Sequence, residues 1–329
     1  MLDRPAEAFE PLNRAYNTVF RPGRLSLGLV IPLEAYAVGA APSMAQHLKK
    51  ATLAESLGFA ALWLRDVPFN VPAFGDPGQM FDPFVYLGTL ASATRTIALG
   101  TASVILPLRH PAHVAKAAAT ADVLSDGRML LGIASGDRPD EYPAMNQSFH
   151  DRGARFRDSF GYMRAMATDY PRHESQQGAL SGAIDMLPKP AGARLPLLVT
   201  GGSQQSPDWV AANSDGWITY PRSPDEQGRA VAGYRRRVAA AGGPDKPVIQ
   251  SLYIDLVDDP NTPPAPLHLG FRSGTRSLRR YLREIEALGV NHVAFNLRFN
   301  RAPIEATLAR LADALLPDFP SSQPQRCPA

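Results

Sequence analysis

The sequence predicts a (β/α)₈ TIM barrel with insertions at the C-terminal ends of its strands. Between residues 25 and 316, eight apolar strand-like segments alternate with eight helix-like segments. The strand-like segments are short and nearly continuously apolar, as expected when protein covers both faces of a sheet. The rival architecture is a doubly wound open sheet, which usually carries a glycine fingerprint after its first strand. Residues 30–34 (VIPLE) contain no such fingerprint, so we favour the barrel.

The predicted strands are apolar runs bounded by glycine, proline or polar residues. In chain order they cover residues 25–31, 59–64, 96–100, 128–133, 197–200, 216–219, 247–257 and 292–297. Each is followed by a segment whose apolar residues recur at helical spacing. These predicted helices cover residues 44–57, 84–94, 112–124, 156–170, 207–213, 224–241, 278–288 and 304–316.

Several helix ends carry residues that are typical of such ends. Gly58 and Gly289 follow the helices predicted at 44–57 and 278–288, and glycine is the usual residue just past a helix C-terminus. Asp82 is a good N-cap for the next helix, and Pro83 occupies its first position. These signals support the element boundaries independently of the apolar pattern.

The two ends of the chain differ in composition from the middle. Residues 1–24 are polar and contain several prolines, so we interpret them as an N-terminal extension. Residues 25–316 form the barrel domain. Residues 317–329 are rich in proline and serine and are expected to form a flexible C-terminal tail.

Composition excludes several classes of protein. The 34 basic and 31 acidic residues give a net charge of +3, and no run of five like charges occurs, so no nucleic-acid partner is expected. The single cysteine, Cys327, allows no intramolecular disulfide and fits a reducing compartment. The first twenty residues lack the apolar core of a signal peptide, and no segment is long and apolar enough to span a membrane. We expect a cytoplasmic protein that does not associate with membranes.

The longest connections follow predicted strands 2, 4 and 7. They cover residues 65–80, 134–153 and 258–275, at the barrel end where chemistry occurs in this fold, so they are expected to wall the ligand site. The connection at 258–275 is rich in proline and contains glycine. It is interpreted either as a mobile lid or as a disordered surface loop.

A glycine pair follows strand 5. Gly201 and Gly202 let main-chain N–H groups approach a ligand, Ser203 and Ser206 add hydroxyl donors, and Pro207 begins a helix. Together they predict an anion site suited to phosphate. The alternative is an ordinary tight turn, because many turns have the same composition.

Small and charged residues follow strand 4. Ser135 and Gly136 suggest a ligand close to the main chain, with Asp137 or Arg138 beside it. The alternative is a charged turn stabilised by Asp137 and Arg138 themselves. Farther along, Arg155 lies near the start of a helix that faces the same site.

Other chemistries find little support. His110 and His113 lack a third ligand, so no metal site is predicted. No Gly-x-Ser-x-Gly segment occurs, and hydrolysis by a catalytic triad is therefore not supported. Most aromatic residues, Trp63 among them, are interpreted as core, whereas Phe69 and Phe74 lie where an apolar substrate wall is possible.

Residues 99–137 (LGTASVILPLRHPAHVAKAAATADVLSDGRMLLGIASGD) resemble the signature of the bacterial luciferase-like flavin monooxygenase family. The shared pattern is a strand, a small-residue turn, L-P-x-x-H-P, a helix ending in D-x-L-S-x-G-R, and a second strand. The resemblance recurs at 197–219 and fits the whole core at 25–316. The segments WLRDVPF, FGDPGQMFDPF and GDRPDEY are similar to an uncharacterised branch of the family.

The resemblance implies a TIM barrel that binds FMN, or in some relatives the deazaflavin coenzyme F420, at the strand C-termini. It places Ala102 and Ser103 under the flavin ring, where relatives have a cis non-proline peptide bond. It places Ser135 and Gly136 beside the cofactor. The implied phosphate site contains Arg155, Gly201, Gly202, Ser203 and Ser206.

The implied reaction uses reduced FMN, supplied by a separate flavin reductase, and O₂ to oxygenate a small organic substrate. Two alternatives are F420-dependent hydride transfer and a non-catalytic flavin-binding subunit. Relatives also suggest a homo-oligomer. Luciferases carry a catalytic histidine after strand 2, where this chain has Arg65-Asp66-Val67. The catalytic residue is therefore left open, with Asp66 and Arg138 as candidates; Asp66 either orients a ligand or pairs with Arg65.

Overall fold

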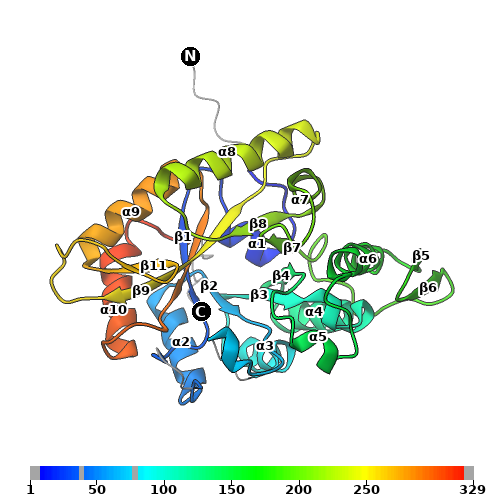
Figure 1. Cartoon of the computed structure of the whole chain (residues 1–329), viewed down its shortest axis with the longest axis horizontal. Helices are drawn as coiled ribbons and strands as arrows, with labels where there is room; N and C mark the ends of the chain where they lie inside the picture. The colour runs from blue at the N-terminus through cyan, green and yellow to red at the C-terminus, as the bar shows by residue number, and fades with distance from the viewer. Residues whose placement is uncertain (1–7, 37–40, 76–80, 322–329) are drawn as a thin grey trace, which may run out of the picture.

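Eight parallel strands form a closed barrel, which confirms the predicted fold (Figure 1). The computed structural model describes residues 8–36, 41–75 and 81–321 of the 329-residue chain. Neighbouring strands follow the order β9, β12, β1, β2, β3, β4, β7 and β8, and β8 pairs again with β9. The barrel strands are β1 (Ser26–Val30), β2 (Ala61–Leu64), β3 (Ala98–Ile105), β4 (Met129–Ala134), β7 (Leu197–Thr200), β8 (Gly216–Thr219), β9 (Val248–Leu256) and β12 (His292–Asn296).

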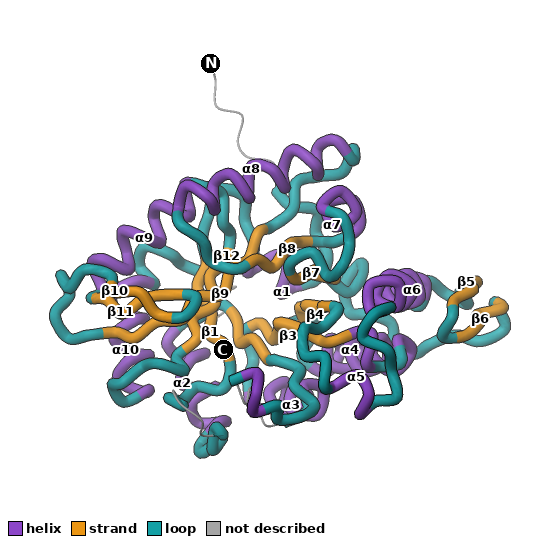
Figure 2. Tube along the Cα trace, in the orientation of Figure 1, coloured by secondary structure: helices purple, strands orange, loops and turns teal. Residues whose placement is uncertain are grey.

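Helices surround the barrel, and each of the eight predicted helices is present (Figure 2). They are α2 (His47–Leu57), α3 (Pro83–Ala93), α4 (Pro111–Leu124), α6 (Arg152–Ala165), α7 (Pro207–Asn213), α8 (Pro224–Ala240), α9 (Thr275–Ala287) and α10 (Ile304–Leu315). Asp82 caps α3 as predicted, since its carboxylate accepts from the N–H groups of Phe84 and Val85. Several boundaries differ from the prediction: for example, α6 spans Arg152–Ala165 instead of 156–170, and β3 runs on to Ile105.

The barrel interior is filled by side chains. Alternate residues of β2 face opposite ways: Leu62 packs under the outer helices, whereas Trp63 belongs to the inner core. Gly28 leaves the space that His292 occupies, because a Cβ atom at Gly28 would lie 2.6 Å from His292 Nε2. Gly100 makes room in the same way for the Trp63 ring. The barrel is therefore a packed core, and a ligand must bind at one of its ends.

A short helix that the sequence analysis did not predict packs on the N-terminal end of the barrel. It is α1 (Arg14–Val19), and its buried Tyr16 and Phe20 join the inner core. Asn13 caps it, accepting from the N–H of Tyr16, and donates to Oδ1 of Asp122 at 2.9 Å. Residues from Phe9 onward thus pack as part of the barrel core.

The connection at 258–275 has a defined structure, so its interpretation as a disordered loop is wrong; the mobile lid stays a prediction. This connection folds into a hairpin of β10 (Ala265–Leu267) and β11 (Gly270–Ser273), and β11 pairs in parallel with the outer half of β9. Gly270 allows this close pairing, because a Cβ atom there would collide with the Tyr253 carbonyl. A second hairpin, β5 (Arg172–Ser175) and β6 (Gly178–Ser181), projects from the body beside α6 (Figure 2).

The start of the predicted flexible tail is also ordered. Phe319 is fully buried in the outer core, beneath the guanidinium of Arg283. The expectation of a frayed tail is therefore wrong for residues 317–321, because one aromatic side chain anchors them; residues 322–329 lie outside the described part. Within the described ranges, no helix is long and apolar enough to cross a bilayer.

Candidate functional site

The C-terminal end of the barrel is divided into two unlike halves. Residues two or four positions beyond an inner-core residue face the same way along a strand. By this rule β3, β4 and β7 present small side chains inward, and β2, β8, β9 and β12 present large ones. The small residues are Ala102, Ala134 and Thr200; the large ones are Arg65, Tyr220, Tyr253 and Arg298. Side chains as small as these would let a ligand come close to the main chain.

The middle of β3 has an irregular backbone on this small half. The peptide bond between Ala102 and Ser103 is cis, in agreement with the resemblance. The pairing of β3 with β4 shifts register between Thr101 and Val104. The Ser103 hydroxyl forms a hydrogen bond with the hydroxyl of Thr200 on β7. β3 and β7 are therefore joined across β4 directly beside the proposed ring position.

The turn after β4 lies against the end of β3. Gly136 has φ +78°, and a Cβ atom there would lie 2.8 Å from both Ile105 Cγ2 and the Tyr142 hydroxyl. The Tyr142 hydroxyl donates to the Ser135 carbonyl. Glycine is thus required here, and Ser135 and Gly136 are held next to the end of β3.

The turn at 201–206 has the main-chain form of an anion-binding nest. Gly201, Ser203 and Gln204 all have positive φ values. Among the described residues, the N–H groups of Gly202, Ser203 and Gln204 find no acceptor. Adjacent main-chain N–H groups in such a turn form a concavity that suits phosphate oxygens.

The two serine hydroxyls of this turn are engaged within the protein. Ser203 donates its hydroxyl to the Thr200 carbonyl at 2.8 Å. Ser206 accepts from the N–H of Trp209 as the N-cap of α7. In this structure the Ser203 hydroxyl proton is engaged, so the main-chain N–H groups are the unused donors of the turn, and a hydroxyl donor to an anion stays a prediction.

The first turn of α6, which contains Arg155, packs beside this turn. Gln205 donates to the Gly153 carbonyl at 2.8 Å and accepts from Arg157 at 2.8 Å, which ties the first turns of α6 to the 201–206 turn. One terminal nitrogen of Arg155 donates to the Pro107 carbonyl at 3.3 Å. Its Nε is buried without a hydrogen-bond partner among the described residues. A buried, unused donor next to a nest is what a bound phosphate would satisfy.

Asp66 has a different partner from the one predicted. Its carboxylate receives two hydrogen bonds from Arg109, at 2.8 and 2.7 Å, and one from the N–H of Ile105. The pairing with Arg65 is therefore wrong. Because both oxygens are occupied and the side chain is buried, Asp66 is a positioning residue for the segment after β3.

Arg138, the other candidate, is buried at the rim. Its guanidinium lies over the Phe74 ring at 4.4 Å, and one nitrogen is 3.9 Å from Oε1 of Glu141. Burial raises the pKa of Glu141 to about 7, with Asp66 and Asp137 adding to the rise and Arg138 opposing it. The sequence analysis missed Glu141: it lies on α5 (Glu141–Ala144), a short helix with no sequence signal of its own, and only tertiary packing buries it.

His110 has a structural role, whereas His113 lies on the exposed surface of α4. His110 caps α4, with Nδ1 accepting from the N–H of Ala112 at 3.2 Å, while Nε2 faces the Gln177 carbonyl. Across the described ranges, no group of three or more His, Cys, Asp or Glu side chains is arranged to hold a metal ion.

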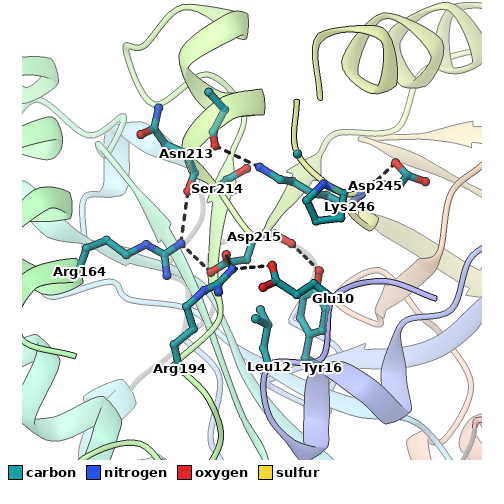
Figure 3. A pocket seen from close by; sticks show the side chains of 13 residues that line it. Glu10, Leu12, Tyr16, Arg164, Arg194, Asn213, Ser214, Asp215, Asp245 and Lys246 are labelled. Carbon is teal, nitrogen blue, oxygen red and sulfur yellow. Dashed lines mark hydrogen bonds and ion pairs between the residues drawn. The ribbon is translucent and has the colours of Figure 1, made fainter. Parts of the chain in front are cut away.

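A cavity of about 280 Å³ lies at the opposite, N-terminal end of the barrel (Figure 3). Four of its charged side chains pair with one another: Glu10, Arg164, Arg194 and Asp215. Asp215 accepts from Arg164 at 2.6 Å, from Arg194 at 3.0 Å and from the N–H of Leu197 at 2.8 Å. The cavity therefore contains a structural ion-pair network and is separate from the candidate site.

The chain is similar to several known proteins. The model of a family described as luciferase-like monooxygenase matches residues 25–258. An uncharacterised protein of Mycobacterium tuberculosis is 32% identical over 225 residues, which cover 64% of this chain and 79% of that protein. The oxygenase component of a flavin-dependent trigonelline monooxygenase from Acinetobacter baylyi is 31% identical over 133 residues, covering 40% of this chain and 34% of that one.

A solved structure extends the comparison to the fold. An F420-dependent secondary alcohol dehydrogenase, in complex with an F420-acetone adduct, superimposes with a TM-score of 0.73. The match covers 89% of this chain and 98% of that one at 16% sequence identity. At this identity the likeness concerns the fold alone.

Proposed function

The chain belongs to the luciferase-like monooxygenase family, and from this premise we propose that it is an FMN-dependent monooxygenase. It would use reduced FMN and O₂ to oxygenate a small organic substrate. The flavin-dependent relative from Acinetobacter supports this choice of cofactor. When bound, FMN would supply the reaction with O₂, which protein side chains do not offer.

The observation that carries the proposal is the buried Nε of Arg155, which has no hydrogen-bond partner among the described residues and belongs to the helix turn that packs beside the 201–206 nest. Arg155 and the N–H groups of Gly202, Ser203 and Gln204 would hold the cofactor phosphate. The ring would lie over the small half of the barrel end, with Ala102, Ser103, Ser135 and Gly136 beside it.

The large half of the barrel end would contact the substrate. Tyr220 and Tyr253 face inward there, and Arg138 closes the rim above Phe74. We keep Arg138 as the candidate for stabilising negative charge near the substrate, because a buried guanidinium acts strongly where water is excluded. Asp66 would act indirectly, by fixing Arg109 and the chain after β3.

The second candidate is an F420-dependent oxidoreductase that transfers a hydride. The fold shared with the F420-dependent alcohol dehydrogenase supports it, and a phosphate of that cofactor could use the same turn and Arg155. A third candidate is a flavin-binding subunit without catalysis. It predicts cofactor retention without turnover.

We also propose a separate flavin reductase as partner. The Acinetobacter relative is named as an oxygenase component, which implies a second component that delivers reduced flavin. A homo-oligomer and a cytoplasmic location remain predictions of the sequence analysis.

Cofactor titration of the purified full chain tests the proposal. FMN and F420 are titrated separately while their absorption and fluorescence are followed. We expect FMN to bind and Arg155→Met to weaken its binding by about tenfold or more, through the loss of charge-assisted hydrogen bonds. Arg236→Met removes an exposed cation on α8 and should leave the affinity unchanged.

The outcomes separate the candidates. Binding of F420 without binding of FMN would favour hydride transfer. FMN binding without substrate-dependent O₂ consumption across a substrate panel would favour the non-catalytic subunit. No binding of either cofactor, or equal FMN binding by Arg155→Met, would overturn the proposed site.

A further inference from the structure

Gly201, the first residue of the 201–206 turn, is fixed by contacts with β8 and with the residue that follows β8. Its N–H donates to the Ile218 carbonyl at 2.8 Å. Its carbonyl accepts from the indole Nε1 of Trp217 at 3.0 Å. A Cβ atom on Gly201 would lie 3.8 Å from the Tyr220 ring. The peptide groups on both sides of Gly201 therefore have a defined orientation.

The indole that makes this hydrogen bond is itself fixed by packing. Trp217 stacks on Tyr234, with ring centroids 5.2 Å apart and an angle of 29° between the ring planes. Tyr234 is buried, and the guanidinium of Arg222 lies 5.9 Å from the Trp217 ring. Arg222 donates in turn to the hydroxyl of Thr219 at 2.8 Å and to Oε1 of Gln227 at 3.0 Å. A donor locked in this way holds its acceptor in one position.

The peptide group between Gly201 and Gly202 needs such a donor. With glycine on both sides, this peptide plane meets none of the Cβ clashes that limit its rotation between other residues. If the plane turned over, the Gly202 N–H would point in a different direction at little steric cost. The turn sequence alone therefore does not fix the direction of this N–H.

The hydrogen bond from Trp217 fixes it. The peptide group is planar and trans, so the Gly201 carbonyl and the Gly202 N–H point in opposite directions. Trp217 packs against the outer core, whereas its neighbour Ile218 belongs to the inner core. The carbonyl is thus drawn toward the layer of helices, and the N–H is turned away from that layer. Among the described residues this N–H has no acceptor, and it is the first of the nest.

We propose that Trp217 is a positioning residue that makes the chain prefer a flavin with a phosphate, because its hold on the Gly201 carbonyl aims the Gly202 N–H at the anion in the nest. This role rests on the proposed function for the identity of that anion, the phosphate of FMN. Trp217 has one side-chain donor, which Gly201 already uses, so the indole acts through the main chain and not by direct contact.

A role in packing alone would have a different consequence. Loss of packing lowers the stability of the fold and affects ligands with and without a phosphate alike. Loss of the aim of one nest N–H affects a ligand with a phosphate and spares one without it. FMN and riboflavin differ only in this phosphate, so the ratio of their affinities separates the two roles.

Titration of the purified full chain with FMN and with riboflavin, followed by flavin fluorescence, tests the role of Trp217. We expect the wild type to bind FMN more tightly than riboflavin. Trp217→Phe keeps an aromatic ring beside Tyr234 and lacks the N–H. In this variant the Kd for FMN should rise by about fivefold to tenfold, and the Kd for riboflavin should stay within about twofold.

The matched control is Trp209→Phe. Trp209 lies in the first turn of α7, directly after the 201–206 turn, and packs on Phe160 with ring centroids 5.0 Å apart. Its indole N–H forms no hydrogen bond within the part of the chain that the structure describes. Both Kd values should stay within about twofold of the wild type. If Trp217→Phe does not fold, benzothienylalanine at position 217 carries the test, because sulfur replaces the N–H and the two-ring shape is kept.

The outcomes distinguish this role from the proposed function. An equal loss of affinity for both flavins in the variant at 217, or an unchanged affinity for FMN, would overturn the role of Trp217 and leave the proposed function standing. Binding of neither flavin by the wild type would overturn the proposed function and this role with it. Equal binding of FMN and riboflavin by the wild type would overturn the phosphate site and therefore the role of Trp217.

Discussion

Inside the barrel, the indole Nε1 of Trp63 donates a hydrogen bond to Nε2 of His292 at 2.9 Å. Because Nε2 accepts, the ring proton of neutral His292 lies on Nδ1, which faces the Ser26 hydroxyl at 2.7 Å. Ser26 donates in turn to the Val19 carbonyl at the end of α1. This chain of bonds joins the packed interior to the helix at its N-terminal end, and it requires an uncharged imidazole.

We therefore predict that His292 makes folding stability depend on pH. Burial lowers the pKa of His292 from 6.5 to about 3. Below pH 6.5 the unfolded chain binds a proton that the folded protein does not, so stability falls as the pH falls. Between pH 6.5 and 5 this contribution is about 1.5 kcal/mol.

Urea unfolding of the wild type and of His292→Gln, each at pH 6.5 and pH 5, measures this contribution of His292 to stability. When the pH falls from 6.5 to 5, the free energy of unfolding should fall by about 1.5 kcal/mol more in the wild type than in His292→Gln. The other titrating groups are present in both proteins, so their contributions cancel in this difference. Parallel pH curves for the two proteins would show that His292 titrates normally in the fold.

A second prediction concerns Arg128, which is 2% exposed. Its guanidinium donates to the carbonyls of Ala91, Thr94, Ile97 and Ser125, and no described carboxylate forms an ion pair with it. Arg128 thus provides hydrogen-bond donors for main-chain carbonyls at the ends of α3 and α4 and at the start of β3. Arg128→Lys should lower the free energy of unfolding by about 2–4 kcal/mol, because lysine cannot reach so many acceptors.

The matched control is Arg95→Lys. Arg95 is exposed and also donates to nearby carbonyls, those of Ser92 and Thr94. Its replacement should change stability by less than about 0.5 kcal/mol. Equal losses in the two variants, measured by chemical denaturation, would contradict the role given to Arg128.

The third prediction concerns the ion pair between Asp66 and Arg109. Asp66 is the buried member of this pair, whereas Arg109 is partly exposed, so Asp66→Asn removes the main partner of Arg109 and should cost about 2 kcal/mol of stability. It should also lower hydrogen-exchange protection at Ile105, whose N–H donates to the same carboxylate.

Asp82 provides the comparison, since it pairs with the same arginine at 2.8 Å from a half-exposed position. Asparagine keeps the N-cap of α3, so Asp82→Asn should cost less than about 1 kcal/mol. If Asp66→Asn proves as mild as Asp82→Asn, Asp66 is available for a direct role in the reaction.

The fourth prediction concerns Asp215 at the opposite end of the barrel. Asp215→Asn weakens the pairing with Arg164 and Arg194, and should lower stability by about 2–4 kcal/mol without changing FMN affinity. Asp208→Asn, at an exposed ion pair, should have an effect below about 1 kcal/mol. A loss of FMN affinity in Asp215→Asn would indicate that the two ends of the barrel are coupled.

Local sequence was sufficient for the barrel and most of its elements. Apolar runs and helical periodicity depend on neighbouring residues, and β8 and α7 match their predicted ranges in full. Where the local signal was weak, the prediction failed. The helix α1 and the buried Phe319 lie in polar, proline-rich segments whose order comes from packing on distant parts of the chain.

The sequence by itself determined the eight-fold alternation of strands and helices, the glycines of the 201–206 turn, and the small residues within β3 and after β4. Each of these depends on a short stretch of chain and its allowed backbone conformations. Only the tertiary structure decided that Asp66 faces Arg109 rather than Arg65, that Trp63 meets His292, and that Glu141 is buried. Those contacts join residues that are brought together by barrel closure and loop packing, so neither composition nor spacing could reveal them.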